Sequence, residues 1–245
     1  MKIYKEDKET IFLSQFKDPL MDHLYKKILF HLKDAPGKKL LDVGCGAGKV
    51  ISLAGKDGFE VLGVEIEEKV AGLAQKNLQK ERVKGKIITV DILKTKLKKE
   101  QFDVVVCSEV IEHVDSPEKI IQEIHRLLKK DGILILTTPH NQRYWTVSDE
   151  FAEHKRRFSI KQIKKILANF EIKKIYTVGF PGMASLILIY NFLVKLLRIQ
   201  HNASWRRQQF KQWPFYLVST ILLRIDDIFN GLNFGIDIVA VAKKK

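Results

Sequence analysis

Short apolar runs alternate with helical patterns along most of the chain. Between the runs, apolar residues recur at the three- and four-residue spacing of an amphipathic helix, as they do after Ser159. Strands that alternate with helices form βαβ units around a mostly parallel sheet. The pattern therefore predicts an α/β, doubly wound, Rossmann-like fold. The predicted strands occupy residues 38–45, 59–65, 86–91, 102–108, 132–139, 171–180 and 235–243.

Two of the predicted helices carry boundary signals. Pro117 after Ser116 marks a helix start, with the serine as cap and the proline at the first helical position, and Asp131-Gly132 is expected to end that helix. The polar N-terminal segment, residues 1–37, holds one helical stretch at about 10–34, which Pro36-Gly37 ends. Its apolar face is formed by Leu20, Leu24, Ile28 and His31.

Residues 181–234 interrupt the alternation of strands and helices. They contain two apolar stretches, MASLILIYNFLVKLL and WPFYLVSTILL, separated by a basic segment around Trp205, Arg206 and Arg207. Neither stretch reaches the ~20 apolar residues that a membrane-spanning helix needs. Two readings stay open: a pair of lid helices packed on the domain, or an amphipathic element on a membrane surface. We expect a single domain over 1–245, with a core at 38–180 and 235–245.

Composition narrows the class of protein. The chain has 245 residues, 45% of them hydrophobic, enough for one α/β domain with a sizeable core. Its two cysteines, Cys45 and Cys107, form no disulfide framework, and the charged N-terminus lacks an apolar signal segment, so we expect a cytoplasmic location. A net charge of +14 suits nucleic acid, an anionic membrane surface, or simply a solvated exterior.

A glycine-rich turn carries the candidate chemistry. Three glycines in LLDVGCGAG permit a tight turn after a buried strand and a close approach of the backbone to a ligand. A P-loop is excluded because Val50 follows Gly48-Lys49, and a dinucleotide fingerprint fails because Lys49 replaces its third glycine. A third pattern is an acidic residue followed by G-x-G-x-G. Asp42, Gly44, Gly46 and Gly48 match it at every position. Glu65 ends the next strand, where a carboxylate can accept hydrogen bonds from both ribose hydroxyls.

In this combination the chain resembles the class I S-adenosylmethionine-dependent methyltransferases. Within that class it is most similar to the ubiquinone-type O-methyltransferases and related small-molecule enzymes. The resemblance runs from about residue 38 to 180, with the final strand added, and it implies a seven-stranded sheet whose last strand is antiparallel. It also implies S-adenosyl-L-methionine as cofactor and S-adenosyl-L-homocysteine as product. The motifs that carry it are LLDVGCGAG, VLGVEIEEK, VDI, FDVVVCSEVIEHV and LLKKDGILILTTP.

The resemblance assigns a donor pocket residue by residue. Asp42 would orient the amino end of the methionine moiety, and the backbone of Gly44, Cys45, Gly46 and Gly48 would line the methionine and ribose. Glu65 would hold the ribose hydroxyls. The remaining positions would be Ile66 against the adenine, Asp91 at the adenine amino group with Ile92 packed near it, and Ser108 and Glu109 on the methyl-donor side.

Each of these assignments has a purely structural alternative. Asp42 can act as a helix-dipole partner, Glu65 as a solvated strand end, and Asp91 as a turn residue. Ile66 and Ile92 can be ordinary core residues. Cys45 and Cys107 are interpreted as small packed side chains rather than nucleophiles.

The segment SEVIEHV provides a candidate metal or general-base site. On a helix, Glu109, Glu112 and His113 would share one face, and two carboxylates with an imidazole can bind a divalent ion. In some relatives the matching E-x-x-E-H carries a metal, and His154 would be a fourth ligand here. The alternatives are that His113 packs near the substrate without a metal, or that His113 or His154 acts as a general base.

The preferred function is methyl transfer to a small, lipophilic hydroxyl compound at or near a membrane. The acceptor is expected to contact the N-terminal helix, the loop from His140 to Trp145, and residues 181–234. An RNA methyltransferase is a second hypothesis, although no appended RNA-binding motif is present. A third is a cofactor-binding protein without activity on the same fold. A dehydrogenase is disfavoured by Lys49.

Overall fold

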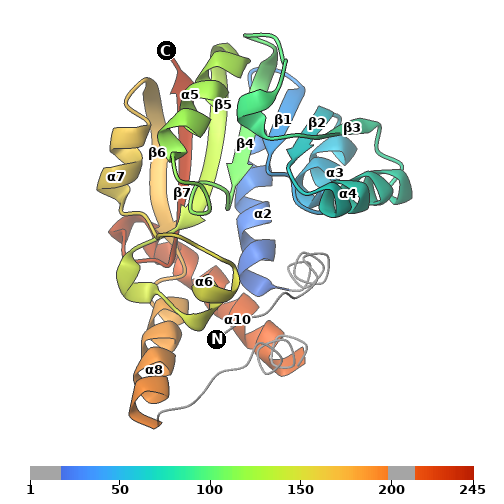
Figure 1. The fold of residues 1–245 in the computed structure, drawn as a ribbon. Coiled ribbons are helices and arrows are strands. Elements are labelled where there is room, and N and C mark those ends of the chain that lie inside the picture. The colour runs from blue at the N-terminus through green and yellow to red at the C-terminus, as the bar shows by residue number, and fades with distance from the viewer. Residues whose placement is uncertain (1–17, 198–212) are drawn as a thin grey trace.

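One seven-stranded sheet organises the protein. The computed structural model describes residues 18–197 and 213–245, and its strands follow the order β3-β2-β1-β4-β5-β7-β6 (Figure 1). β1 to β5 pair in parallel, and β7 runs antiparallel to both β5 and β6. The prediction of a mostly parallel sheet with an antiparallel last strand is confirmed. The strands are β1 Lys39–Val43, β2 Glu60–Glu65, β3 Gly85–Thr89, β4 Phe102–Ser108, β5 Leu128–Pro139, β6 Phe170–Val178 and β7 Asp237–Lys244.

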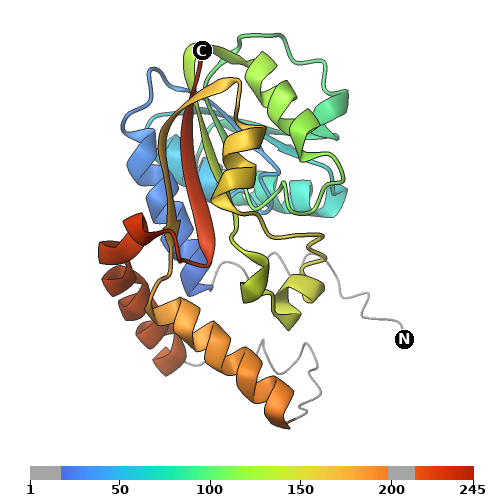
Figure 2. The same ribbon diagram turned by 90° about the vertical axis from the view of Figure 1, so that its left-hand side faces the viewer.

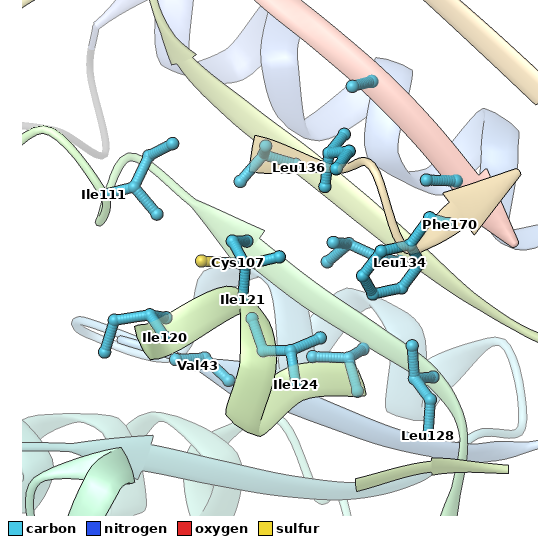
Figure 3. Close-up of a cluster of buried hydrophobic side chains, with 14 of the residues drawn as sticks. Val43, Cys107, Ile111, Ile120, Ile121, Ile124, Leu128, Leu134, Leu136 and Phe170 are labelled. Carbon is cyan, nitrogen blue, oxygen red and sulfur yellow. The ribbon is translucent and has the colours of Figure 1, made fainter. Parts of the chain in front are cut away.

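Helices cover both faces of this sheet. α5 and α7 bury their apolar sides in one core, and α2, α3 and α4 bury theirs in the core on the opposite face. Figure 3 shows the first core, where Cys107 of β4 lies beside Ile121 of α5 and Leu134 of β5 lies beside Phe170. The helices are α2 Pro19–Leu32, α3 Lys49–Lys56, α4 Glu68–Lys80, α5 Pro117–Leu127, α6 Val147–Phe151, α7 Ile160–Ile166, α8 Gly182–Leu197 and α10 Trp213–Asp226, with short 3₁₀ turns η1 Ile92–Lys94, η2 Gln142–Tyr144 and η3 Asp227–Leu232.

The expected end of α5 is wrong. The helix stops at Leu127, and Asp131-Gly132 lies inside β5, where Asp131 has a φ of 64°. Leu128 pairs with Phe102 of β4 and is fully buried, so strand pairing and burial override the turn signal of Asp-Gly. Ser116 stands at the N-cap without a side-chain hydrogen bond, whereas Ser159 forms a capping box with Gln162.

The insertion between β6 and β7 is helical, as expected. α8 and α10 lie together beyond one end of the sheet (Figure 2). The Asp226 carboxylate accepts hydrogen bonds from the N–H groups of Gly182 (2.7 Å) and Met183 (3.0 Å), which ties the start of α8 to the end of α10. The expected basic segment at Trp205, Arg206 and Arg207, and residues 10–17 of the expected first helix, lie outside the described residues. None of the helices in the described parts of the chain is long and apolar enough to cross a bilayer.

Candidate active site

The glycine turn lies where the carboxyl ends of β1 and β2 meet. Gly44, Gly46 and Gly48 all have positive φ angles, of 68°, 51° and 80°. Residues that carry a Cβ rarely adopt such angles. The N–H of Gly44 donates to the Val64 carbonyl at 2.8 Å, which holds the turn against β2. A Cβ on Gly44 would come within 2.5 Å of Val110 Cγ2. Both conformation and space therefore require glycine at the first position of the turn.

Glu65 links the end of β2 to the glycine turn. Its Oε2 accepts a hydrogen bond from the Gly46 N–H at 3.0 Å, and its Oε1 accepts from the N–H groups of Ile66 (2.8 Å) and Glu67 (3.1 Å). The side chain is 6% exposed, so it is not a solvated strand end. A carboxylate has about four lone-pair positions, so capacity for a further donor remains.

Asp42 is a buried carboxylate at the end of β1. It is 2% exposed, and no hydrogen bond to it is recorded among the described residues. Burial, followed by the nearby charge of Glu65, raises the pKa of Asp42 well above its ordinary value. An unpartnered buried carboxylate is costly, so this position is suited to a cationic ligand group.

The positions expected at the adenine differ in burial. Ile66 is 66% exposed and therefore is not an ordinary core residue, whereas Ile92 packs in the core beneath the sheet edge. The Asp91 Oδ1 accepts a hydrogen bond from the Leu93 N–H at 3.0 Å and caps η1. Asp91 thus performs the structural turn role, and its second oxygen accepts no hydrogen bond from the residues that the structure describes.

A chain of hydroxyl groups leads from β4 to β5. Thr137 Oγ1 donates to Glu109 Oε1 at 2.9 Å and lies 2.8 Å from Ser108 Oγ, so the serine donates to the threonine. Glu109 has a φ of 55°, in the left-handed region, which turns the chain sharply after β4. Burial raises the pKa of Glu109, and the Thr137 hydrogen bond opposes that shift. Sequence reasoning did not find Thr137, because its partners lie on a neighbouring strand.

A family model described as a methyltransferase domain matches residues 41–136, which contain Asp42, the glycine turn, Glu65, Asp91 and Glu109 but not Thr137. Over these residues the chain is similar to the class I S-adenosylmethionine-dependent methyltransferases. The ubiquinone biosynthesis O-methyltransferase of Actinobacillus pleuropneumoniae is 35% identical over 112 residues, which are 42% of this chain and 46% of that protein. The enzyme of the same name from Pelagibacter ubique is 32% identical over 123 residues, 49% of this chain and 50% of that protein. The chain thus spans about half the length of the curated relatives it matches.

Several solved structures share the fold over most of the chain. The geranyl diphosphate C-methyltransferase of Streptomyces coelicolor, solved with Mg²⁺, geranyl diphosphate and S-adenosyl-L-homocysteine, has a TM-score of 0.63 at 18% identity, covering 91% of this chain and 79% of that one. The [4+2]-cyclase SpnF has a TM-score of 0.61 at 18% identity, covering 91% and 80%. At these identities the likeness establishes the fold alone.

A second group of polar side chains lies beside the expected donor pocket. Residues 109–113 form a turn rather than a helix, yet the ligand atoms of Glu112, His113 and His154 lie within 4.8 Å of one another. The Lys155 N–H donates to the Glu112 carbonyl at 2.9 Å and thereby brings His154 beside His113. Glu109 stays outside the group, because its carboxylate bonds to Thr137.

The donor atoms of this group suit a metal ion. Glu112 is fully buried, its Oε2 accepts from Thr138 Oγ1 at 3.0 Å, and its Oε1 has no hydrogen-bond partner within residues 18–197 and 213–245. That unpaired oxygen lies 3.9 Å from His113 Nε2. Two imidazoles and one carboxylate favour Zn²⁺, Mn²⁺ or another transition metal over Mg²⁺ or Ca²⁺.

Asp149 and Arg157, which the sequence did not single out, hold His154 in place. Asp149 Oδ1 lies 2.9 Å from His154 Nδ1 and accepts from Arg157 Nε at 2.7 Å. Burial acts to raise the pKa of Asp149, but the hydrogen bonds from His154 and Arg157 outweigh it and lower the pKa to about 2. The ionised aspartate fixes the proton on His154 Nδ1 and leaves Nε2 as an acceptor. A sequence signal for Asp149 does exist, because Thr146 and Asp149 have the spacing of a capping box.

The two cysteines are packed side chains, as interpreted from the sequence. Cys45 and Cys107 are both free and buried, and burial raises the pKa of each thiol well above its ordinary value. A Cβ on Gly63 would come within 2.7 Å of Cys45 Sγ, so the sulfur packs over Gly63 on one face of β2. Neither thiol is activated as a nucleophile.

Proposed function

We propose that this protein transfers the methyl group of S-adenosylmethionine to a hydroxyl group of a small, lipophilic acceptor. The observation that carries the proposal is the buried, unpartnered Asp42 beside Glu65 and the glycine turn, in a domain similar to the class I family. The curated relatives are named for O-methylation in ubiquinone biosynthesis, which supports a small hydroxyl acceptor.

Donor binding follows from the chemistry of these groups. The Asp42 carboxylate receives the amino group of the methionine moiety, whose positive charge relieves the repulsion from Glu65. Glu65 receives the ribose hydroxyls while its bond to Gly46 keeps the turn in shape. The exposed Ile66 provides an apolar surface for the adenine, and Asp91 is its expected polar neighbour.

The reaction is a displacement at the sulfonium methyl carbon, and the donor is already activated. Positioning of donor and acceptor in line can supply up to roughly 7–11 kcal/mol. A base assists when the acceptor is a hydroxyl group. Burial, with the neighbouring His154, lowers the pKa of His113 to about 4, so its ring is neutral at pH 7 but only a weak base. His154, oriented by Asp149, is the alternative base.

Glu112, His113 and His154 would hold a metal ion if one binds beside the donor pocket. When bound, such an ion supplies Lewis-acid polarisation of an acceptor oxygen. Glu109 and Thr137 then line the donor side of the same space, and Asp149 keeps the His154 ring in its orientation.

The insertion at residues 181–234 supports two further parts of the proposal, a lipophilic acceptor and a peripheral location at a membrane. Asn191 of α8 donates to the Trp145 carbonyl at 2.9 Å, which joins the insertion to the loop after β5. Tyr144 in that loop is buried and donates from its hydroxyl to the Phe234 carbonyl at 2.6 Å. The lid hypothesis and the membrane hypothesis both place α8 next to the loop that follows β5.

RNA methylation is the alternative function, favoured by the charge of +14 and by the E-x-x-E-H sequence with His154 nearby. A cofactor-binding protein without methyl transfer is a further alternative, because a neighbour of the same fold is described as a cyclase. Incubation with methyl-labelled donor and separated lipid, quinone and RNA fractions distinguishes them. Label in a lipid or quinone hydroxyl supports the proposal, and label in RNA supports the alternative. Donor binding without labelled product in every fraction supports the non-catalytic reading.

A further inference from the structure

A basic groove lies at the edge of the sheet that the insertion covers. It has a volume of about 570 Å³ and is bounded by α2, β6, α10 and η3. Four cationic side chains from three of these elements line it: Lys26 and Lys27 of α2, Lys174 of β6 and Arg224 of α10. Aromatic groups lie among them, with Lys174 Nζ 5.8 Å from the centre of the Phe30 ring.

Most of this positive charge is uncompensated. The groove's carboxylate, Asp227, is engaged by Lys27 at 2.7 Å and by His23 at 2.9 Å. Lys26, Lys174 and Arg224 are exposed, and no ion pair is recorded for them in the parts of the chain that the structure describes. Three unpaired cations that converge on one groove create a local positive potential suited to an anionic group.

An aliphatic surface adjoins the groove on α10. Leu217, Val218, Ile221 and Ile225 are 42% to 53% exposed and follow the spacing of one helix face. Arg224 belongs to the same exposed face, so the cation and the aliphatic side chains point to one side of the helix. The face continues onto η3, where Ile228 is 79% exposed.

α8 extends this apolar surface. Ile189, Phe192 and Leu196 are 55% to 64% exposed, and α8 and α10 lie side by side away from the sheet (Figure 2). Exposed apolar side chains gathered on two neighbouring helices mark an interaction surface rather than ordinary exterior. The aliphatic face of α10 and η3, together with the exposed side chains of α8, is called the apolar surface below.

We infer that the basic groove binds the phosphate of an anionic lipid while the apolar surface rests in the same bilayer. Aliphatic and aromatic side chains bordered by lysine and arginine match an interfacial element, which gains from apolar burial and from attraction to anionic headgroups. A second copy of the chain is a poor occupant, because it would bring two sets of unpaired cations together. Helices too short to span a bilayer can still lie in its surface.

The biological purpose of this docking rests on the proposed function. A methyltransferase bound to a membrane would meet a lipophilic acceptor in the bilayer, where that acceptor dissolves. Docking itself requires neither donor nor turnover. Vesicle binding and donor binding can therefore be measured separately on one sample, and each can fail without the other.

The test is co-sedimentation of the full chain with vesicles of phosphatidylcholine alone and of equimolar phosphatidylcholine and phosphatidylglycerol. The double variant Lys174→Gln/Arg224→Gln removes two groove cations. We expect it to weaken binding to the anionic vesicles about thirtyfold, because each cation near such a surface contributes ~1 kcal/mol. The matched control is Lys84→Gln/Lys86→Gln, which removes the same charge from exposed positions at the opposite edge of the sheet, and we expect less than a threefold change.

The apolar contribution is tested with Ile221→Asn/Ile225→Asn, two exposed positions whose replacement leaves the cores intact. We expect reduced vesicle binding with unchanged thermal unfolding and unchanged donor affinity by calorimetry. Equal losses in the groove variant and its control would overturn the inference, because net charge alone would then explain binding. So would strong binding to phosphatidylcholine alone, displacement by millimolar inorganic phosphate, or a dimer in solution that Ile221→Asn/Ile225→Asn dissociates.

Discussion

The Glu65 carboxylate accepts a hydrogen bond from the Gly46 N–H at 3.0 Å, and this contact joins the ends of two neighbouring strands into one pocket wall. The same carboxylate bonds to Ile66 N–H at 2.8 Å, so its position is fixed before a ligand arrives. A preorganised acceptor loses little freedom on binding.

Glu65→Ala is expected to weaken binding of S-adenosyl-L-homocysteine tenfold to a hundredfold in calorimetry. The reason is the loss of hydrogen bonds to a charged group, worth about 1.5–3 kcal/mol. Glu60→Ala, at the exposed start of the same strand, is the control and should bind normally. Unchanged affinity in Glu65→Ala would refute the ribose assignment.

Asp42→Asn is expected to raise thermal stability in the absence of ligand while weakening donor binding at least tenfold. The substitution removes a buried, unpartnered carboxylate that lies near Glu65, and it also removes the charge that receives the amino group. Differential scanning calorimetry and ligand titration on the same variant give both readouts. Asp57→Asn, at an exposed position, should change neither. A variant that is less stable and binds normally would contradict the assignment.

Gly44→Ala is expected to destabilise the protein more than Gly58→Ala does. Both positions have positive φ, which costs alanine about 1–2 kcal/mol, but only the Cβ at Gly44 would clash, with Val110. The clash should add about 1–3 kcal/mol, measured by denaturant unfolding. Val110→Ala in the same chain should recover part of the difference. Equal destabilisation of the two single variants would show that the close approach to Val110 does not matter.

Mn²⁺ or Zn²⁺ is expected to raise the unfolding temperature, and Glu112→Gln is expected to remove that rise. Burial, with the neighbouring Glu109, already raises the pKa of Glu112 well above its usual range, so a neutral glutamine is tolerated by the fold. Glu118→Gln, at an exposed position on α5, is the matched control. An equal response to Mn²⁺ in both variants would place the ion elsewhere.

Asp103→Asn is expected to lower stability by about 1–2 kcal/mol at pH 7. Burial acts to raise the Asp103 pKa, but hydrogen bonds from Lys129 Nζ (2.7 Å) and the Lys39 N–H (3.0 Å) prevail and lower it. A carboxyl with a lowered pKa stabilises the fold above its unfolded value of about 3.9, and that contribution is lost as the pH falls through the folded value. The difference from wild type should therefore shrink below about pH 4, measured by urea unfolding. Asp131→Asn is the exposed comparison.

Much of the fold and of the expected donor site could be predicted because both depend on signals that are local in the chain. The glycine turn after β1 and Glu65 at the end of β2 come together because parallel strands end at the same edge of a sheet. The end of α5 could not be predicted in this way. Asp131-Gly132 has the local signature of a turn, and only the pairing of Leu128 with Phe102 places it inside a strand.

The sequence by itself determined the order of strands and helices, the acidic glycine turn and the second carboxylate, since apolar periodicity and backbone requirements are properties of neighbouring residues. Tertiary structure alone decided which distant groups meet. Glu112, His113 and His154 converge although residues 109–113 are not helical, and Asp149 binds both His154 and Arg157. The basic groove combines Lys26, Lys174 and Arg224 from separate elements. Contacts between such groups depend on how whole elements pack, and packing leaves no periodic signature in the chain.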